Sequence, residues 1–146
     1  MSLRDPLLKM SKSRGDSRSR ILLGDSPEDI HRKVKHALTD SIPGVSYDPV
    51  GRPGVSNLLK ILSYLGEERP TCEAIAADCG TLSLGGFKEY VADNIIKSLA
   101  GFRSEFLRLT QSGGHSSLKD IAVAGAENAR ANADKTIIRV RKAVGL

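Results

Sequence analysis

The chain has 146 residues, of which 40% are hydrophobic and 4% aromatic, with no tryptophan and a formal net charge of +5. This length and composition suit one soluble domain whose core is built from aliphatic side chains. No apolar stretch approaches the roughly 20 residues of a membrane-spanning helix, so no membrane association is expected.

The first 20 residues are strongly basic. They contain six lysines and arginines against two aspartates, which leaves a net charge of only +1 for the rest of the chain. Such a segment suits a polyanionic partner, for example a nucleotide triphosphate or a nucleic acid. Residues 9–13 within it read KMSKS. Composition alone favours a solvated tail here over a phosphate-handling loop, because Ser/Lys/Arg runs near a terminus are typically disordered.

A first helix is predicted to begin at Pro27, with Ser26 as its cap and Asp29 completing a capping box. The apolar positions at helical spacing are Ile30, Val34, Leu38 and Ile42, and the Pro43-Gly44 pair is expected to end the helix. The intervening basic residues are expected to face solvent: His31, Arg32, Lys33, Lys35 and His36.

After a loop at 45–57, which contains two prolines and two glycines, the pattern predicts four more helices. They are expected at 58–65, 71–80, 87 to near Gly113-Gly114, and from a Ser117 cap to Val144. Cys72 and Cys79 would share a face of the second of these helices as reduced, buried thiols, without a zinc-binding spacing. Small residues in the middle of the last helix favour close packing along 87–111. The predicted fold class is all-α, a bundle of about five helices preceded by a flexible basic loop.

Four blocks of sequence resemble the C-terminal part of the tryptophanyl-tRNA synthetases, class I aminoacyl-tRNA synthetases of the bacterial and mitochondrial type. They read KMSKS (9–13), DSPEDIHRKVKHALTDS (25–41), YDPVGRPGVSNLL (47–59) and FKEYVADNII (87–96). A five-residue motif alone is weak evidence, but four blocks in order over most of the chain are specific. The resemblance favours the loop interpretation of KMSKS over the tail.

The resemblance implies ATP-dependent formation of tryptophanyl-adenylate and transfer of tryptophan to its tRNA, with Mg²⁺ accompanying ATP as substrate and no metal bound by the protein. Lys12 is the first catalytic candidate and Lys9 the second, because mobile ammonium groups can follow the pyrophosphate as it leaves. Ser11 and Ser13 would donate hydrogen bonds to phosphate oxygens or hold the loop, and Met10 would anchor it. These five residues form the predicted ATP-binding loop. In the family, Asp-Pro commonly follows this motif directly, whereas Arg14-Gly15 intervenes here and would loosen the loop.

The class I fold also requires a doubly wound nucleotide-binding domain, and no strand–glycine–helix unit for it occurs in this sequence. The chain is therefore expected to be the last portion of the enzyme and inactive alone, with residues 1–24 forming the catalytic loop segment and 25–146 an anticodon-side helical domain. The resemblance further implies a homodimeric full-length enzyme that binds tRNA(Trp), ATP and tryptophan. The expected location is the mitochondrial matrix in a eukaryote, which is favoured, or the cytoplasm in a bacterium.

Two alternatives remain open. Basic residues of the last helix either contact tRNA phosphates or form an ordinary solvated face: Arg130, Lys135, Arg139, Arg141 and Lys142. The chain as a whole is either part of a ligase or a stand-alone helical tRNA-binding module that has no catalytic activity.

Overall fold

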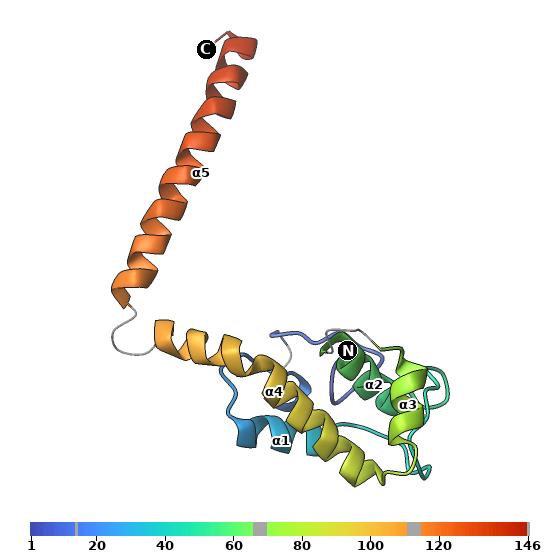
Figure 1. Cartoon of the computed structure of the whole chain (residues 1–146). Coiled ribbons are helices and arrows are strands. Elements are labelled where there is room, and N and C mark those ends of the chain that lie inside the picture. Colours follow the sequence, from blue (N-terminus) through green and yellow to red (C-terminus); the bar gives the residue numbers. More distant parts are fainter. Residues whose placement is uncertain (14, 66–69, 111–114, 146) are drawn as a thin grey trace. The chain divides into compact units, whose positions relative to one another are not determined.

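The computed structural model describes residues 1–13, 15–65, 70–110 and 115–145 (Figure 1). They form five α-helices and one short 3-10 helix, and no strand occurs among them: η1 (Ser17–Ser19), α1 (Pro27–Lys35), α2 (Pro53–Leu65), α3 (Cys72–Cys79), α4 (Leu84–Thr110) and α5 (His115–Val144). The prediction of an all-α fold with about five helices is thus confirmed. The chain divides into two compact units, Met1–Arg103 and Ser104–Leu146. The predicted domain boundary after residue 24 stays a prediction.

Helix α1 begins as the sequence predicts and ends earlier. The Ser26 hydroxyl accepts from the Asp29 amide (3.1 Å) and the Asp29 carboxylate accepts from the Ser26 amide (3.3 Å), which completes the capping box. The helix stops at Lys35, because the amide of Leu38 instead donates to the carbonyl of Leu3 (2.7 Å). Leu38 and Ile42 are 52% and 53% exposed, so their predicted place on the buried face is wrong.

Helix α2 begins at Pro53, five residues before its predicted start at 58. The residue before it, Arg52, is buried, and its guanidinium donates to both carboxylate oxygens of Asp40 (2.8 and 3.0 Å) and to the Ile42 carbonyl (2.8 Å). Gly54 follows at a close backbone approach, where a Cβ would overlap the carbonyl oxygen of Leu38. A compact turn held by Arg52 thus replaces most of the irregular loop that two prolines and two glycines indicated.

Helix α3 agrees with its prediction, since Thr71 caps it by accepting from the Ala74 amide (3.2 Å) and Gly80 follows its last residue. Both cysteines of this helix are free thiols. Cys79 is buried as expected, and burial is the main cause that raises its thiol pKa. Cys72 is only half-buried. The two thiols are therefore not equivalent, although they lie two helical turns apart.

Helix α4 supplies one face of the core through Phe87, Val91 and Ile95, each at most 2% exposed. The helix begins at Leu84, because the Ser83 hydroxyl accepts from the Gly86 amide (3.1 Å). Gly85 and Gly86 therefore belong to its first turn. The helix ends at Thr110; the predicted end near Gly113-Gly114 lies outside the described residues. Phe102 is 70% exposed, so the apolar face predicted from Phe87 onward is buried only in its first half. The other large, fully buried core residues are Leu3, Ile30, Leu58, Leu59, Val34 and Val55.

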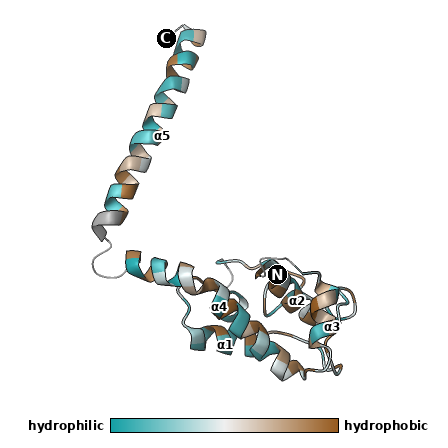
Figure 2. Cartoon of the chain, in the orientation of Figure 1, coloured by the Kyte–Doolittle hydropathy of each residue, from teal (hydrophilic) through white to brown (hydrophobic). Residues whose placement is uncertain are grey.

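Helix α5 begins at His115, so Ser117 lies inside the helix and the prediction that it is the cap is wrong. Apolar and polar residues alternate along it in Figure 2, and its apolar side chains are exposed, with Ile121 at 62% and Val140 at 50%. Its predicted packing along 87–111 stays a prediction. No helix in the described part of the chain is long and apolar enough to cross a membrane.

Candidate functional site

The basic N-terminal segment folds back on itself before it reaches KMSKS. The Ser2 amide donates to the Leu8 carbonyl (2.7 Å), and the Leu3 amide donates to the Ser19 carbonyl (2.9 Å). Asn57, buried in α2, donates from its side-chain amide to the carbonyl of Ser2 (3.2 Å). The stretch between residues 3 and 19 is therefore a closed loop, and both of its ends are tied to the helical core.

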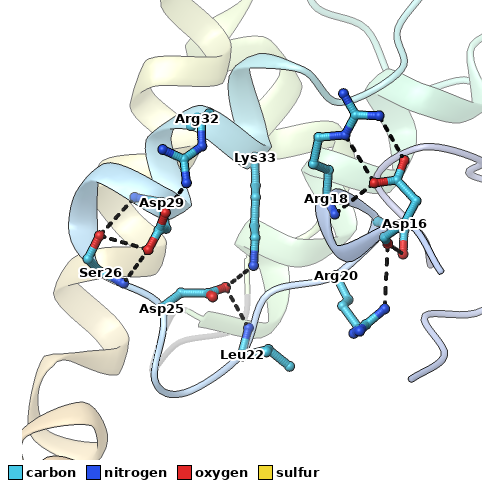
Figure 3. A network of polar contacts seen from close by, with 10 residues as sticks. Asp16, Arg18, Arg20, Leu22, Asp25, Ser26, Asp29, Arg32 and Lys33 are labelled. Carbon is cyan, nitrogen blue, oxygen red and sulfur yellow. Dashed lines mark hydrogen bonds and ion pairs between the residues drawn. The ribbon is translucent and has the colours of Figure 1, made fainter. Parts of the chain in front are cut away.

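Asp16 holds the second half of this loop (Figure 3). Its carboxylate caps η1 by accepting from the Arg18 amide (3.0 Å), and it pairs with the Arg18 guanidinium (3.0 Å) and, more distantly, with Arg4 (3.7 Å). The hydrogen bond from the Arg18 side chain is the largest cause that lowers the pKa of Asp16. Arg20 donates to the carbonyls of Ser11 (3.2 Å) and Asp16 (3.5 Å), so it connects KMSKS to the far side of the loop.

The side chains of KMSKS differ in how far they are exposed to solvent. Lys9, Lys12 and Ser13 are exposed, whereas Met10 and Ser11 are half-buried. Met10 packs against the hydrophobic core, which confirms its predicted anchoring role. Among the described residues, neither Lys9 nor Lys12 has an acidic partner within 4 Å or a side-chain hydrogen bond. As far as the described residues show, the loop thus presents two ammonium groups without acidic partners, on a backbone that Met10 and Arg20 hold.

A buried ion pair joins α1 to the chain just before it (Figure 3). The Lys33 ammonium contacts the Asp25 carboxylate (2.5 Å), and the side chains are only 8% and 11% exposed. The same carboxylate accepts from the Leu22 amide (2.8 Å), which fixes the chain just before α1. The expectation that Lys33 faces solvent is therefore wrong. The sequence does contain the partner, an aspartate eight residues before Lys33. That spacing is too long for a pair within one helix, so the contact can be recognised only once the intervening turn is known.

The other predicted residues occupy less specific surroundings. Every basic candidate of α5 is exposed: Arg130, Lys135, Arg139, Arg141 and Lys142. Their contact with tRNA stays a prediction, as do the catalytic and ATP-binding roles of the loop. Arg14, which separates the motif from Gly15, lies outside the described residues. Over the described ranges, no group of three or more metal-ligating side chains lies close enough together to hold a metal ion.

The comparisons with known proteins agree with the four sequence blocks. Residues 1–100 match the family model described as tRNA synthetases class I (W and Y). The chain belongs to this family. Three tryptophan–tRNA ligases illustrate the similarity: the Rickettsia conorii enzyme is 42% identical over 145 residues, the Bacillus subtilis enzyme 38% over 146, and the mitochondrial Saccharomyces cerevisiae enzyme 39% over 147. These alignments cover 99%, 100% and 99% of this chain.

The fold of this class I synthetase chain also has a solved counterpart. The tryptophanyl-tRNA synthetase from Mycoplasma pneumoniae matches it with a TM-score of 0.71 at 27% identity, covering 100% of this chain and 45% of that one. The chain spans 43% of the Bacillus and Rickettsia relatives and 38% of the Saccharomyces relative, and it corresponds to their C-terminal part. Since both bacterial and mitochondrial relatives match, the similarity is compatible with either cellular location.

Proposed function

We propose that this chain supplies the pyrophosphate-handling loop and the C-terminal helices of a tryptophan–tRNA ligase. The observation that carries the proposal is the loop at 9–13: Lys9 and Lys12 are exposed and have no acidic partner among the described residues, and Met10 packs against the core. The family match over residues 1–100 includes this loop. In this proposal the doubly wound half that binds ATP and tryptophan comes from residues outside this chain, because the described residues contain no strand.

In this proposal the residues of the loop have different roles in the reaction. Charge accumulates on the leaving pyrophosphate as the bond between the α- and β-phosphates of ATP breaks. An ammonium group is a compact charge on a flexible stem, so Lys12 can follow the pyrophosphate and stabilise the transition state, with Lys9 assisting. Ser11 and Ser13 donate hydroxyl hydrogen bonds to phosphate oxygens, and Met10 holds the loop against the hydrophobic core. Mg²⁺ arrives with ATP as part of the substrate.

The proposal includes partners beyond ATP and tryptophan. The basic side chains of α5 contact phosphates of tRNA(Trp), and the complete enzyme is a homodimer, as the resemblance implies. In a eukaryotic cell this enzyme would work in the mitochondrial matrix, and in a bacterium it would work in the cytoplasm.

A graft tests the proposal directly. This chain would replace the matching C-terminal part of the Bacillus subtilis ligase, which is 38% identical to it over 146 residues. The graft should catalyse tryptophan-dependent exchange of pyrophosphate into ATP, whereas the chain alone should not. Exchange by the chain alone, in a preparation free of host synthetase, would place the active site elsewhere.

Substitutions in the graft test the assigned residues. Lys12→Ala should slow single-turnover adenylate formation by about a hundredfold, because a charge-assisted transition-state contact contributes on the order of 3 kcal/mol. ATP binding in the ground state should change little. Lys9→Ala should have a smaller effect. Lys97→Ala is the matched control, since Lys97 is exposed on α4 and lies outside the loop. A parental rate for Lys12→Ala would favour the alternative, a helical tRNA-binding module without catalysis.

A further inference from the structure

A second basic feature lies apart from the KMSKS loop, in a cavity of about 360 Å³ between α1 and the first turn of α4. Its ionisable lining consists of His31, Arg32 and Lys35 from α1 and of Lys88 and Glu89 from α4. None of these residues belongs to the predicted ATP-binding loop. The cavity is partly open to solvent, so a ligand can reach it without rearrangement of the core.

The positive charges in this cavity outnumber the negative ones. Arg32, Lys35 and Lys88 oppose the single carboxylate of Glu89. Arg32 is paired with Asp29, which leaves Lys35 and Lys88 as the lining cations without an acidic partner among the described residues. The His31 Nε2 lies 3.1 Å from a carboxylate oxygen of Asp93, which places its ring beside the cavity. The uncompensated charge therefore resides mainly on Lys35 and Lys88.

Lys88 is held with its ammonium group facing the end of α1. Its Nζ donates to the carbonyl of Ala37 (2.9 Å) and, at longer range, to that of Lys35 (3.4 Å). An ammonium group has three donors, so one N–H remains for a ligand. Lys88 is half-buried, and this burial lowers the pKa of its ammonium group. A partly desolvated cation attracts an anion more strongly than a solvated one does.

The backbone at the start of α4 adds donors to the same cavity. Gly85 lines it, and its amide is one of those that a helix leaves without an intrahelical acceptor, since the helical bonds begin with Phe87 to Ser83 (2.8 Å). Gly85 is exposed, and a Cβ there would meet only the Ser83 hydroxyl, at 3.8 Å. The dipole of this 27-residue helix favours negative charge at that end.

We propose that this cavity binds a phosphate group through the side chains of Lys35 and Lys88 and the backbone amide of Gly85. Two ammonium groups and a backbone amide from two helices that line one cavity suit a tetrahedral group with several acceptor oxygens. The group belongs either to an RNA backbone or to a small phosphorylated compound, and the chemistry of recognition is the same for both. The proposal is independent of adenylate formation, because the cavity and the loop share no residue.

The test uses the 146-residue chain labelled with ¹⁵N and titrated with inorganic phosphate at constant ionic strength. The Gly85 and Gly86 amide resonances should shift and saturate. Lys35→Gln should weaken the apparent affinity about fivefold, which is about 1 kcal/mol. Lys97→Gln, an exposed lysine further along α4, is the matched control and should leave the affinity unchanged. Lys35 has no side-chain partner among the described residues, so its substitution does not endanger folding.

A second titration with a short RNA hairpin identifies the source of the phosphate. If Lys35→Gln weakens both probes and reduces the salt dependence of RNA binding by about one phosphate contact, the group belongs to an RNA backbone. If the substitution weakens inorganic phosphate alone, the cavity takes a small phosphorylated compound. The proposal fails if phosphate gives no saturable shift at Gly85, or if Lys35→Gln and Lys97→Gln bind phosphate equally well.

Discussion

The buried pair of Lys33 and Asp25 leads to a sharp prediction about stability. Lys33→Met keeps the apolar stem and removes the charge, and it leaves the Asp25 carboxylate at 11% exposure with the Leu22 amide as its remaining donor. Removing one partner of a buried ion pair typically costs about 3–5 kcal/mol, because the other charge stays desolvated. We expect about 3 kcal/mol, the lower end, since the carboxylate keeps one hydrogen bond.

Urea unfolding followed by far-UV circular dichroism measures this loss. With a slope of about 1.5 kcal/mol per molar urea for a unit of this size, the midpoint should fall by about 2 M. Lys35→Met is the matched control two residues along α1, because Lys35 is exposed, and its unfolding free energy should stay within about 0.5 kcal/mol of the parent. The reasoning is refuted if Lys33→Met also stays within about 1 kcal/mol. A double variant with Asp25→Asn should recover part of the loss, because no unpaired charge then remains buried.

Two further substitutions test the turn before α2. Asp40→Asn should cost about 2–3 kcal/mol at neutral pH, because it leaves the buried Arg52 without its counter-charge. The hydrogen bond from Arg52 lowers the pKa of Asp40 below its ordinary 3.8. The stabilisation of the fold by the ionised Asp40–Arg52 pair is therefore complete above about pH 4, and it is lost as the pH falls through the lowered pKa. The difference between parent and variant in urea titrations should therefore shrink in acid; a constant difference would contradict the ionic origin. Gly54→Ala should destabilise by several kcal/mol because its Cβ would overlap the Leu38 carbonyl, whereas Gly101→Ala, where a Cβ meets nothing, should stabilise by about 1 kcal/mol. Equal melting temperatures for the two glycine variants would show that the close approach at Gly54 relaxes easily.

Local signals in the sequence were sufficient wherever the stabilising contact is itself local. The capping box of Ser26 and Asp29 involves residues three apart, and so does the Thr71 cap of α3. Helical spacing likewise identified Phe87 and Val91 as core residues. The end of α1 could not be found in this way. It depends on a hydrogen bond between Leu38 and Leu3, which are 35 positions apart, and helical periodicity carries no information about such a partner.

The same limit explains the charged residues that the sequence misplaced. A lysine on a helix is expected in solvent, and only the turn through Leu22 brings Asp25 to Lys33. Arg52 lies in a stretch rich in proline and glycine, yet it is buried at 5% exposure because five acceptor contacts converge on its guanidinium: those to Asp40 (two), Ser46, Ile42 and Gly44. A cation can be buried only where several acceptors surround it. The fold brings these acceptors together, and the spacing of residues along the sequence does not reveal them.

The arrangement of the KMSKS loop fits the demands of the proposed reaction. A group that must follow a departing pyrophosphate needs side-chain freedom, but a backbone that is also free would lose much of its binding energy to ordering on each turnover. Here Arg20 and Met10 hold the backbone, and the ammonium groups of Lys9 and Lys12 stay exposed. Asp16, which follows Arg14-Gly15 in the sequence, caps η1 and pairs with Arg18. A Cβ at Gly15 would meet nothing within 4 Å, so packing does not require the glycine there. Arg20 therefore attaches two points of the loop, Ser11 and Asp16, and leaves the exposed ammonium groups free to move.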